Sequence, residues 1–164
     1  MKPGIFYGTS TGTTEKVAKL IAQAVGVADT DVYDVAKTSP STVGDYDLII
    51  LGAPTYGSGD VQDDMADFLD GVRVLDLKGK KAAVFGCGDE SMSSTFCSGV
   101  EEIYKALKDT GATMVGEYNT FPYRFESSAA VPVQGGEAVG LLVDDVNEPD
   151  KTETRVKDWV KTLI

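Results

Sequence analysis

The segment "GTSTGTTE", residues 8–15, follows a short apolar run and is crowded with groups that can donate hydrogen bonds. It contains two Gly, four Thr and one Ser, but no Lys, Arg or His. If a strand ends before Gly8 and a helix begins near Thr13, the first amides of that helix point outward and favour an anion. Neutral amides and hydroxyls suit a single phosphate monoester, whereas nucleotide triphosphate chemistry requires a Lys and a metal ligand. The alternative is a polar turn whose Ser and Thr residues simply start a helix.

Two further segments combine Gly with side chains that could contact a ligand. In "APTYGSGDVQDD", residues 53–64, Tyr56 lies among Gly residues and is better placed to cover a flat ligand than to fill a core. Local packing of its ring is the alternative. In "GCGDESMSST", residues 86–95, Gly86 and Gly88 allow another molecule to approach the backbone closely. On its own this third segment indicates only a turn, so its meaning depends on where the fold places it.

The elements that must position these segments alternate along the chain between apolar runs and helical patterns. Strands are predicted at residues 4–7, 31–35, 47–53, 81–87, 113–117 and 139–143. Apolar residues recur at helical spacing in four places, at residues 17–24, 65–72, 100–107 and 156–163. This alternation predicts one α/β domain over residues 1–164, a doubly wound, five-stranded parallel sheet with strand order 2-1-3-4-5 and helices on both faces.

In such a sheet, ligands bind beyond the carboxyl ends of the strands, where the strand order reverses. The loops after the first, third and fourth main strands, residues 8–12, 54–63 and 86–95, are therefore expected to meet in one place. Together they would provide a phosphate site at one end and two walls for a planar ring at the other.

Composition narrows the class of function. The chain has 164 residues, 42% of them hydrophobic, and a net charge of −11. Its longest apolar run, residues 48–51, is too short to span a bilayer, so a cytoplasmic protein is expected. The acidic charge disfavours nucleic acid and anionic membranes as partners, and it serves either solubility alone or the attraction of basic proteins. Two Cys and no His provide no metal site.

The three segments, in this order, resemble those of the flavodoxin family. "TSTGTTE" matches the phosphate loop of that family, "APTYGSGD" its first flavin loop and "FGCGDES…F" its second. The segment "VGLLVDDVNEPDKTETRVKDWV" resembles the closing strand and helix, so the resemblance covers essentially the whole chain. Residues 118–136 fit neither the helical nor the strand pattern and look like the extra loop of long-chain flavodoxins, inserted in or after the last strand.

The resemblance implies a non-covalently bound FMN and a low-potential one-electron carrier rather than an enzyme. The carrier would shuttle between semiquinone and hydroquinone and, as a monomer, would pass electrons between basic redox partners such as a flavodoxin reductase. The phosphate would lie on residues 9–14, and the flavin on the other two loops. The implied cofactor-binding residues are Thr9, Ser10, Thr11, Gly12, Thr13, Thr14, Pro54, Thr55, Tyr56, Gly57, Ser58, Gly59, Gly86, Gly88, Asp89, Met92, Phe96 and Cys97.

One residue departs from the family pattern. Most members have a Tyr on the second face of the flavin ring, where this chain has Met92, while Tyr56 replaces the usual Trp on the first face. Looser packing is expected on the Met92 side, unless a ring from the insertion, Tyr118 or Tyr123, fills the gap. The resemblance also implies that the peptide joining residues 57 and 58 flips when the flavin is reduced, and Gly57 makes this flip easy because positive φ costs Gly little.

Other proteins with this strand order are the alternatives. A quinone reductase would use FMN on the same fold but would need a substrate pocket over the flavin. A response-regulator receiver requires paired acids after the first strand and a phosphoacceptor Asp at the third, where this chain has Tyr7-Gly8 and Ala53-Pro54. A small tyrosine phosphatase requires Cys and Arg separated by five residues, and neither Cys87 nor Cys97 begins such a motif.

Overall fold

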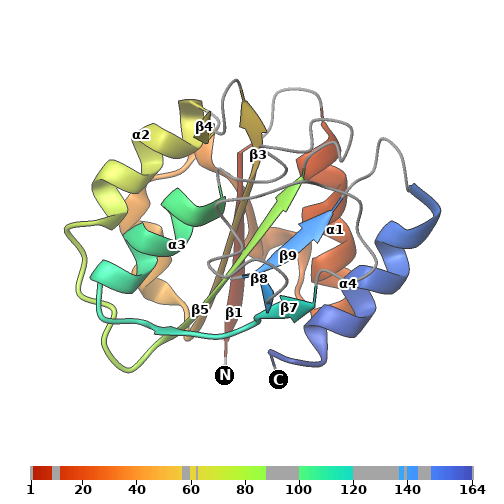
Figure 1. The fold of residues 1–164 in the computed structure, drawn as a ribbon. Coiled ribbons are helices and arrows are strands. Elements are labelled where there is room, and N and C mark those ends of the chain that lie inside the picture. Colours follow the sequence, from red (N-terminus) through yellow and green to blue (C-terminus); the bar gives the residue numbers. More distant parts are fainter. Residues whose placement is uncertain are drawn as a thin grey trace.

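The computed structural model describes residues 2–8, 12–56, 60–61, 63–87, 100–119, 137–138, 140–143 and 149–163. These residues form a central sheet between two layers of helices (Figure 1). The main strands are parallel and lie side by side in the order β2 (Val32–Asp34), β1 (Pro3–Tyr7), β3 (Leu48–Tyr56), β5 (Lys81–Cys87) and β6 (Thr113–Met114). The doubly wound α/β fold and the strand order predicted from the sequence are confirmed.

The fifth position of this sheet is shared by two segments that are distant in the sequence. β6 pairs in parallel with residues 81–82 at the start of β5, and β9 (Leu141–Val143) pairs in parallel with residues 85–87 at its end. The strand predicted over residues 113–117 thus ends early, at Met114. The amide of Val115 still donates to the carbonyl of Ala82 over 2.9 Å, and the next residue, Gly116, has a φ of +84°, which extended strand backbone does not adopt.

Two short antiparallel pairs accompany the parallel sheet. β4 (Asp60–Val61) pairs with the last two residues of β3, so the sheet is not parallel throughout. β7 (Tyr118–Asn119) pairs with β8 (Glu137–Ala138) in a separate two-stranded sheet. Both strands lie between β6 and β9 in the sequence, so the chain leaves the fifth position and later returns to it. Apart from β7, the predicted insertion at residues 118–136 lies outside the described residues.

Helices cover both faces of the sheet (Figure 1). α1 (Thr13–Val25) and α4 (Thr152–Val160) pack on one face, and α2 (Asp63–Val72) and α3 (Val100–Asp109) pack on the other. Short 3-10 helices lie at η1 (Asp29–Asp31), η2 (Val35–Lys37), η3 (Pro40–Asp45) and η4 (Pro149–Lys151). Within the described part of the chain, no helix combines the length and the apolar character that crossing a membrane requires.

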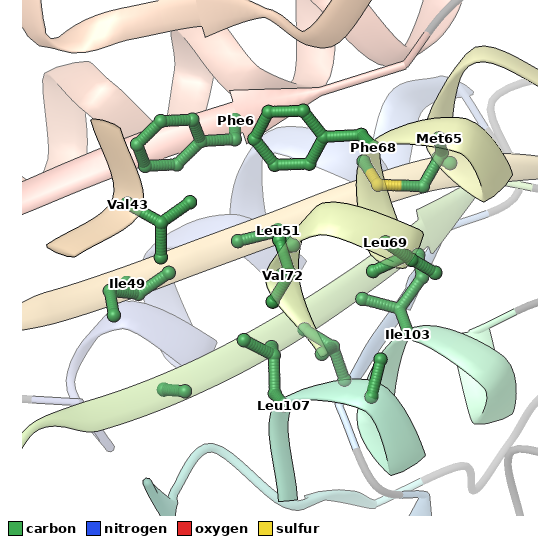
Figure 2. Close-up of a cluster of buried hydrophobic side chains, with 14 of the residues drawn as sticks. Phe6, Val43, Ile49, Leu51, Met65, Phe68, Leu69, Val72, Ile103 and Leu107 are labelled. Carbon is green, nitrogen blue, oxygen red and sulfur yellow. The ribbon is translucent and has the colours of Figure 1, made fainter. Parts of the chain in front are cut away.

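Each face of the sheet has its own hydrophobic core, because successive strand residues point to opposite faces. Ile49 and Leu51 face α2 and α3, whereas Leu48 and Ile50 face α1 and α4. The first core contains Phe6, Ile49, Leu51, Met65, Leu69, Ile103 and Leu107 (Figure 2). The second contains Ile5, Val17, Ile21, Ile50, Phe85 and Trp159. A shift of one residue in β3 would exchange its two apolar faces, so this packing fixes the register of the strand against both helix layers.

The last helix also holds the chain where it leaves the sheet. Trp159 is fully buried, and its indole N–H donates to the carbonyl of Gly116 over 2.7 Å. α4 ends at Val160, before the predicted end of the helical pattern, but Leu163 is still buried in the turn that follows. The apolar spacing therefore identified the buried face of this segment, which continues beyond the helix to Leu163.

Candidate functional site at the carboxyl edge of the sheet

The carboxyl ends of β1, β3 and β5 lie next to one another at one edge of the sheet (Figure 1). Tyr7 is the register partner of Gly52, and Ala53 is that of Gly86. The amide of Gly8, the first residue after β1, donates to the carbonyl of Gly52 over 2.9 Å. The structure therefore brings the starts of the three predicted loops together, at the point where the strand order reverses.

α1 begins shortly after the carboxyl end of β1, as predicted. Its first residue is Thr13, and the residue that precedes it, Gly12, has a φ of +90° and a ψ of −9°. The carbonyl of Gly12 accepts the first helical hydrogen bond, from the amide of Lys16 over 3.1 Å. Because the N-cap residue is Gly12, no Ser or Thr side chain caps this helix from the N-cap position. The outward amides of the first turn thus lie at the carboxyl edge, where an anion could bind them.

Thr14 is the second residue of α1 and is only 1% exposed. Thr14 is thus buried although it lies in the first turn of the helix. Thr14 is the one predicted phosphate-binding side chain whose burial the structure describes.

Tyr7 and Glu15 join the end of β1 to the first turn of α1, a contact that the sequence analysis missed. The hydroxyl of Tyr7 donates to Oε1 of Glu15 over 3.0 Å, and Nζ of Lys19 lies 3.5 Å from the same oxygen. Burial, followed by the hydrogen bond to Glu15, raises the pKa of Tyr7 to about 12, so this hydroxyl keeps its proton at ordinary pH. A Tyr that ends a strand eight residues before a Glu in the first turn of the next helix was the available signal.

The second predicted loop begins later than expected. Pro54, Thr55 and Tyr56 belong to β3, which the sequence analysis ended at Ala53. They continue the strand because Thr55 and Tyr56 pair antiparallel with β4. Tyr56 is therefore the last residue of a strand rather than part of a loop.

The third predicted loop begins where β5 ends. Gly86 and Cys87 are the last residues of β5 and are buried. Gly86 lies between two neighbours in register, Ala53 of β3 and Leu142 of β9. The loop thus starts from the interior of the sheet, next to the ends of β3 and β9.

Many predicted site residues fall on segments that the structure does not describe. Those outside the described residues are Thr9, Ser10, Thr11, Gly57, Ser58, Gly59, Gly88, Asp89, Met92, Phe96 and Cys97. The described residues Gly12, Thr13, Thr14, Pro54, Thr55, Tyr56 and Gly86 all lie at the carboxyl edge, on the elements that lead into or out of the three loops.

The charged residues of the three loop segments are acidic. Residues 8–15, 53–64 and 86–95 contain no Lys or Arg. The first turn of α1 contains Glu15, and that of α3 contains Glu101 and Glu102. In the described part of the chain, no three His, Cys, Asp or Glu side chains gather in a way that could hold a metal ion. The backbone amides at the start of α1 are therefore the positive end of a site that is otherwise negatively charged.

Comparison with known sequences supports a relationship over the full length of the chain. The family model described as Flavodoxin matches residues 5–159. The flavodoxin of Buchnera aphidicola subsp. Acyrthosiphon pisum is 40% identical over 164 residues, which cover 99% of this chain and 95% of that protein. Flavodoxin 1 of Escherichia coli (strain K12) is 39% identical over 161 residues, which cover 98% of this chain and 91% of that protein.

Comparison with solved structures also finds a flavodoxin. The crystal structure of the Fusobacterium nucleatum flavodoxin bound to flavin mononucleotide aligns with a TM-score of 0.87 and 27% sequence identity. The alignment covers 99% of this chain and 97% of that one.

Proposed function

The chain belongs to the flavodoxin family, and we propose that it binds one FMN, without a covalent link, at the carboxyl edge of its sheet. Like the flavodoxins to which it is related, it is an electron-transfer protein and not an enzyme. When bound, the flavin supplies the redox chemistry. The protein has to bind it, exclude water from it and set the charge around it.

The observation that carries this proposal is the geometry between β1 and α1. Gly12 adopts a φ of +90° and is followed at once by the first turn of α1, which starts at the switch point of the sheet. Such a turn presents several outward amides to one anion, and the phosphate end of FMN is an anion of suitable size. The residues present thus fit the phosphate group. Residues 9–14 would hold it, and the hydroxyls of Thr and Ser would add donors to the amides.

The flavin ring would lie between the end of β3 and the segment that follows β5. The antiparallel pair of β3 and β4 holds Tyr56 at the strand end, beside the ends of β1 and β5. From that position its ring would cover one face of the flavin. Gly86, Gly88 and Asp89 would lie along the pyrimidine edge, and Met92 would lie on the second face, with Phe96 and Cys97 closing the loop.

We propose a low midpoint potential for the second reduction of the flavin, because the binding loops contain acidic residues and no cations. Asp60, Asp63 and Asp64 follow Tyr56 on β4 and at the start of α2, and Asp89 and Glu90 follow β5 in the sequence. A reduced flavin tends to become anionic, and additional negative charge is unfavourable beside these carboxylates. The carrier is therefore expected to cycle between semiquinone and hydroquinone, and the Gly57-Ser58 peptide would favour the semiquinone by changing its orientation.

A reductive titration with dithionite, followed by absorbance, tests the proposal. The purified protein is expected to be yellow, to turn blue at half reduction and to become pale at full reduction. Substitution Gly57→Ala is expected to leave FMN bound and to lower the amount of the blue form, because the added Cβ opposes positive φ. A colourless protein that binds no added FMN would rule out the proposed function. An unchanged yield of the blue form in Gly57→Ala would remove only the role of that peptide.

The acidic surface suggests which partners the carrier would meet. With a net charge of −11, the protein would attract basic patches on a reductase and on an electron acceptor. Electron transfer from such a reductase is then expected to slow as salt is added. A rate that does not depend on salt would contradict this electrostatic attraction but would leave the FMN site unaffected.

A further inference from the structure

Glu15 occupies a position in α1 from which its carboxylate could compete with a bound phosphate. With Gly12 as the N-cap, Glu15 is the third residue of the helix. A Glu at this position often folds back and accepts a hydrogen bond from the amide of the N-cap residue. That amide belongs to the same turn that the proposed function assigns to phosphate. A carboxylate folded in this way would occupy a donor of the site and would repel the phosphate charge.

The structure holds the carboxylate in another direction. Within the described residues, the partners of Glu15 are the hydroxyl of Tyr7, at 3.0 Å, and Nζ of Lys19, at 3.5 Å, both on Oε1. The side chain of Lys19 is 60% exposed, so this i,i+4 ion pair is weak and easily screened. Tyr7 is the stronger support because it is only 7% exposed and its ring is part of the core under α1 and α4.

Tyr7 is also placed to act at any ordinary pH and without moving. It is the last residue of β1, and the strand is held on both sides by β2 and β3. Its raised pKa, about 12, means that the hydroxyl remains a donor under all ordinary conditions. The carboxylate of Glu15, 40% exposed, is thus attached to a rigid part of the sheet by a charge-assisted hydrogen bond.

From this geometry we propose that Tyr7 is a positioning residue of the phosphate site, which keeps the carboxylate of Glu15 away from the amides at the start of α1. The inference rests on the proposed function, since it concerns the affinity for the phosphate end of FMN. It predicts different effects on the binding of the two ends of FMN. Loss of the Tyr7 hydroxyl would weaken binding of the phosphate and leave binding of the ring unchanged.

The test compares FMN with riboflavin, which has the same ring and no phosphate. Both are titrated into the full-length apoprotein, and binding is followed by quenching of flavin fluorescence. In Tyr7→Phe the carboxylate is released, and the dissociation constant for FMN is expected to rise about tenfold, the usual effect of one hydrogen bond to a charged group. The constant for riboflavin is expected to remain that of the wild type.

A second substitution identifies Glu15 as the cause. In the double variant Tyr7→Phe/Glu15→Ala both the competing charge and the acceptor that could bond the N-cap amide are absent, and FMN affinity is expected to return to the wild-type value. The matched control is Tyr33→Phe, which removes a Tyr hydroxyl that bonds Tyr46 at 2.5 Å on the opposite face of the sheet. It should leave the ratio of FMN to riboflavin affinity unchanged.

Inorganic phosphate is a third probe for the case in which riboflavin binds too weakly to measure. Its competition with FMN should weaken in Tyr7→Phe and recover in the double variant. The inference is overturned if Tyr7→Phe weakens FMN and riboflavin equally, if it has no effect on FMN, or if Glu15→Ala in the Tyr7→Phe background does not restore affinity. A wild-type protein that binds neither flavin would overturn the proposed function as well, so the two failures are distinguishable.

Discussion

At the scale of single residues, Gly52 of β3 shows how tightly the core is packed around Phe85 of β5. A Cβ at this position would overlap the ring of Phe85, which is itself completely buried. β3 cannot move aside without disturbing its pairing with β1 and β5, and the ring of Phe85 is enclosed by the core. The absence of a side chain at residue 52 is therefore a requirement of packing rather than of backbone conformation.

Substitution Gly52→Ala is expected to lower the free energy of unfolding by about 1–3 kcal/mol, the usual cost of an overpacked core. Urea denaturation followed by circular dichroism measures the change. The control is Gly44→Ala in η3, where a Cβ would meet nothing within 4 Å. That variant should stay within about 0.5 kcal/mol of the wild type. Equal losses in both variants would contradict the packing argument.

Tyr7 gives the stability of the protein a dependence on alkaline pH. Its pKa is 10.0 in the unfolded chain and about 12 in the folded one, so between these values only the unfolded state loses this proton. The stabilisation is complete below pH 10 and is lost as pH rises toward 12, with a slope of up to about 1.4 kcal/mol per pH unit. Burial and hydrogen bonds raise the pKa of Tyr46 as well, which adds in the same direction.

Urea denaturation at a series of pH values measures this slope. In Tyr7→Phe the decline between pH 10 and pH 12 is expected to be shallower than in the wild type, because one of the two groups no longer titrates. Parallel curves for the two proteins would show that Tyr7 does not contribute.

At the scale of elements, α1 is bounded by a Gly in the left-handed region at each end. Gly12 precedes the helix with a φ of +90°, and Gly26 follows it with a φ of +85°. A Cβ at either position would meet nothing within 4 Å. Any penalty of a side chain at these positions therefore comes from the backbone alone. The two ends differ in that only Gly12 lies at the carboxyl edge of the sheet.

This difference separates stability from binding. Gly12→Ala and Gly26→Ala are each expected to lower the free energy of unfolding by about 1 kcal/mol. Only Gly12→Ala is expected to weaken FMN as well, because it changes the direction of the amides at the start of α1. Denaturation and FMN titration of both variants provide the comparison. If Gly26→Ala weakened FMN to the same degree, the phosphate site could not be placed at Gly12.

The elements also show how much the sequence could reveal. Continuous apolar runs such as residues 48–51 and 82–85 predicted the buried parallel strands, and the spacing of Met65, Phe68 and Leu69 predicted the face of α2. The extension of β3 through Tyr56 was not predictable, because it depends on pairing with a two-residue strand among Gly and Asp residues. The contact of Tyr7 with Glu15 depends on the angle between β1 and α1, which no periodicity encodes.

At the scale of the whole molecule, the protein carries a large excess of negative charge. The chain contains 26 acidic and 15 basic residues, and the carboxyl edge of the sheet has acidic helix starts. Several described ion pairs are exposed pairs within one helix, such as Lys157 with Glu153 at 2.9 Å, and these contribute little. Mutual repulsion of the excess carboxylates therefore opposes the compact state.

Added salt is expected to stabilise the protein through screening. Between about 0.01 M and about 0.3 M NaCl the free energy of unfolding should rise, by an amount on the order of 1 kcal/mol. Urea denaturation at fixed pH measures the rise. Choline chloride at the same ionic strength is the control, because a general screening effect does not depend on the cation. A rise seen with sodium alone would indicate ion binding instead.

The shared fifth position of the sheet has a consequence for how the native structure opens. β6 pairs with the start of β5 and β9 pairs with its end. Either of these two strands can therefore detach without the other, while β1, β3 and β5 stay paired. In hydrogen exchange, the amides of residues 113–115 and of 141–143 should then exchange at two unrelated rates, both faster than those of β3. The β9 part of this edge, next to the proposed flavin site, could therefore open locally and expose its amides to solvent independently of the β6 part, while the rest of the sheet stays intact.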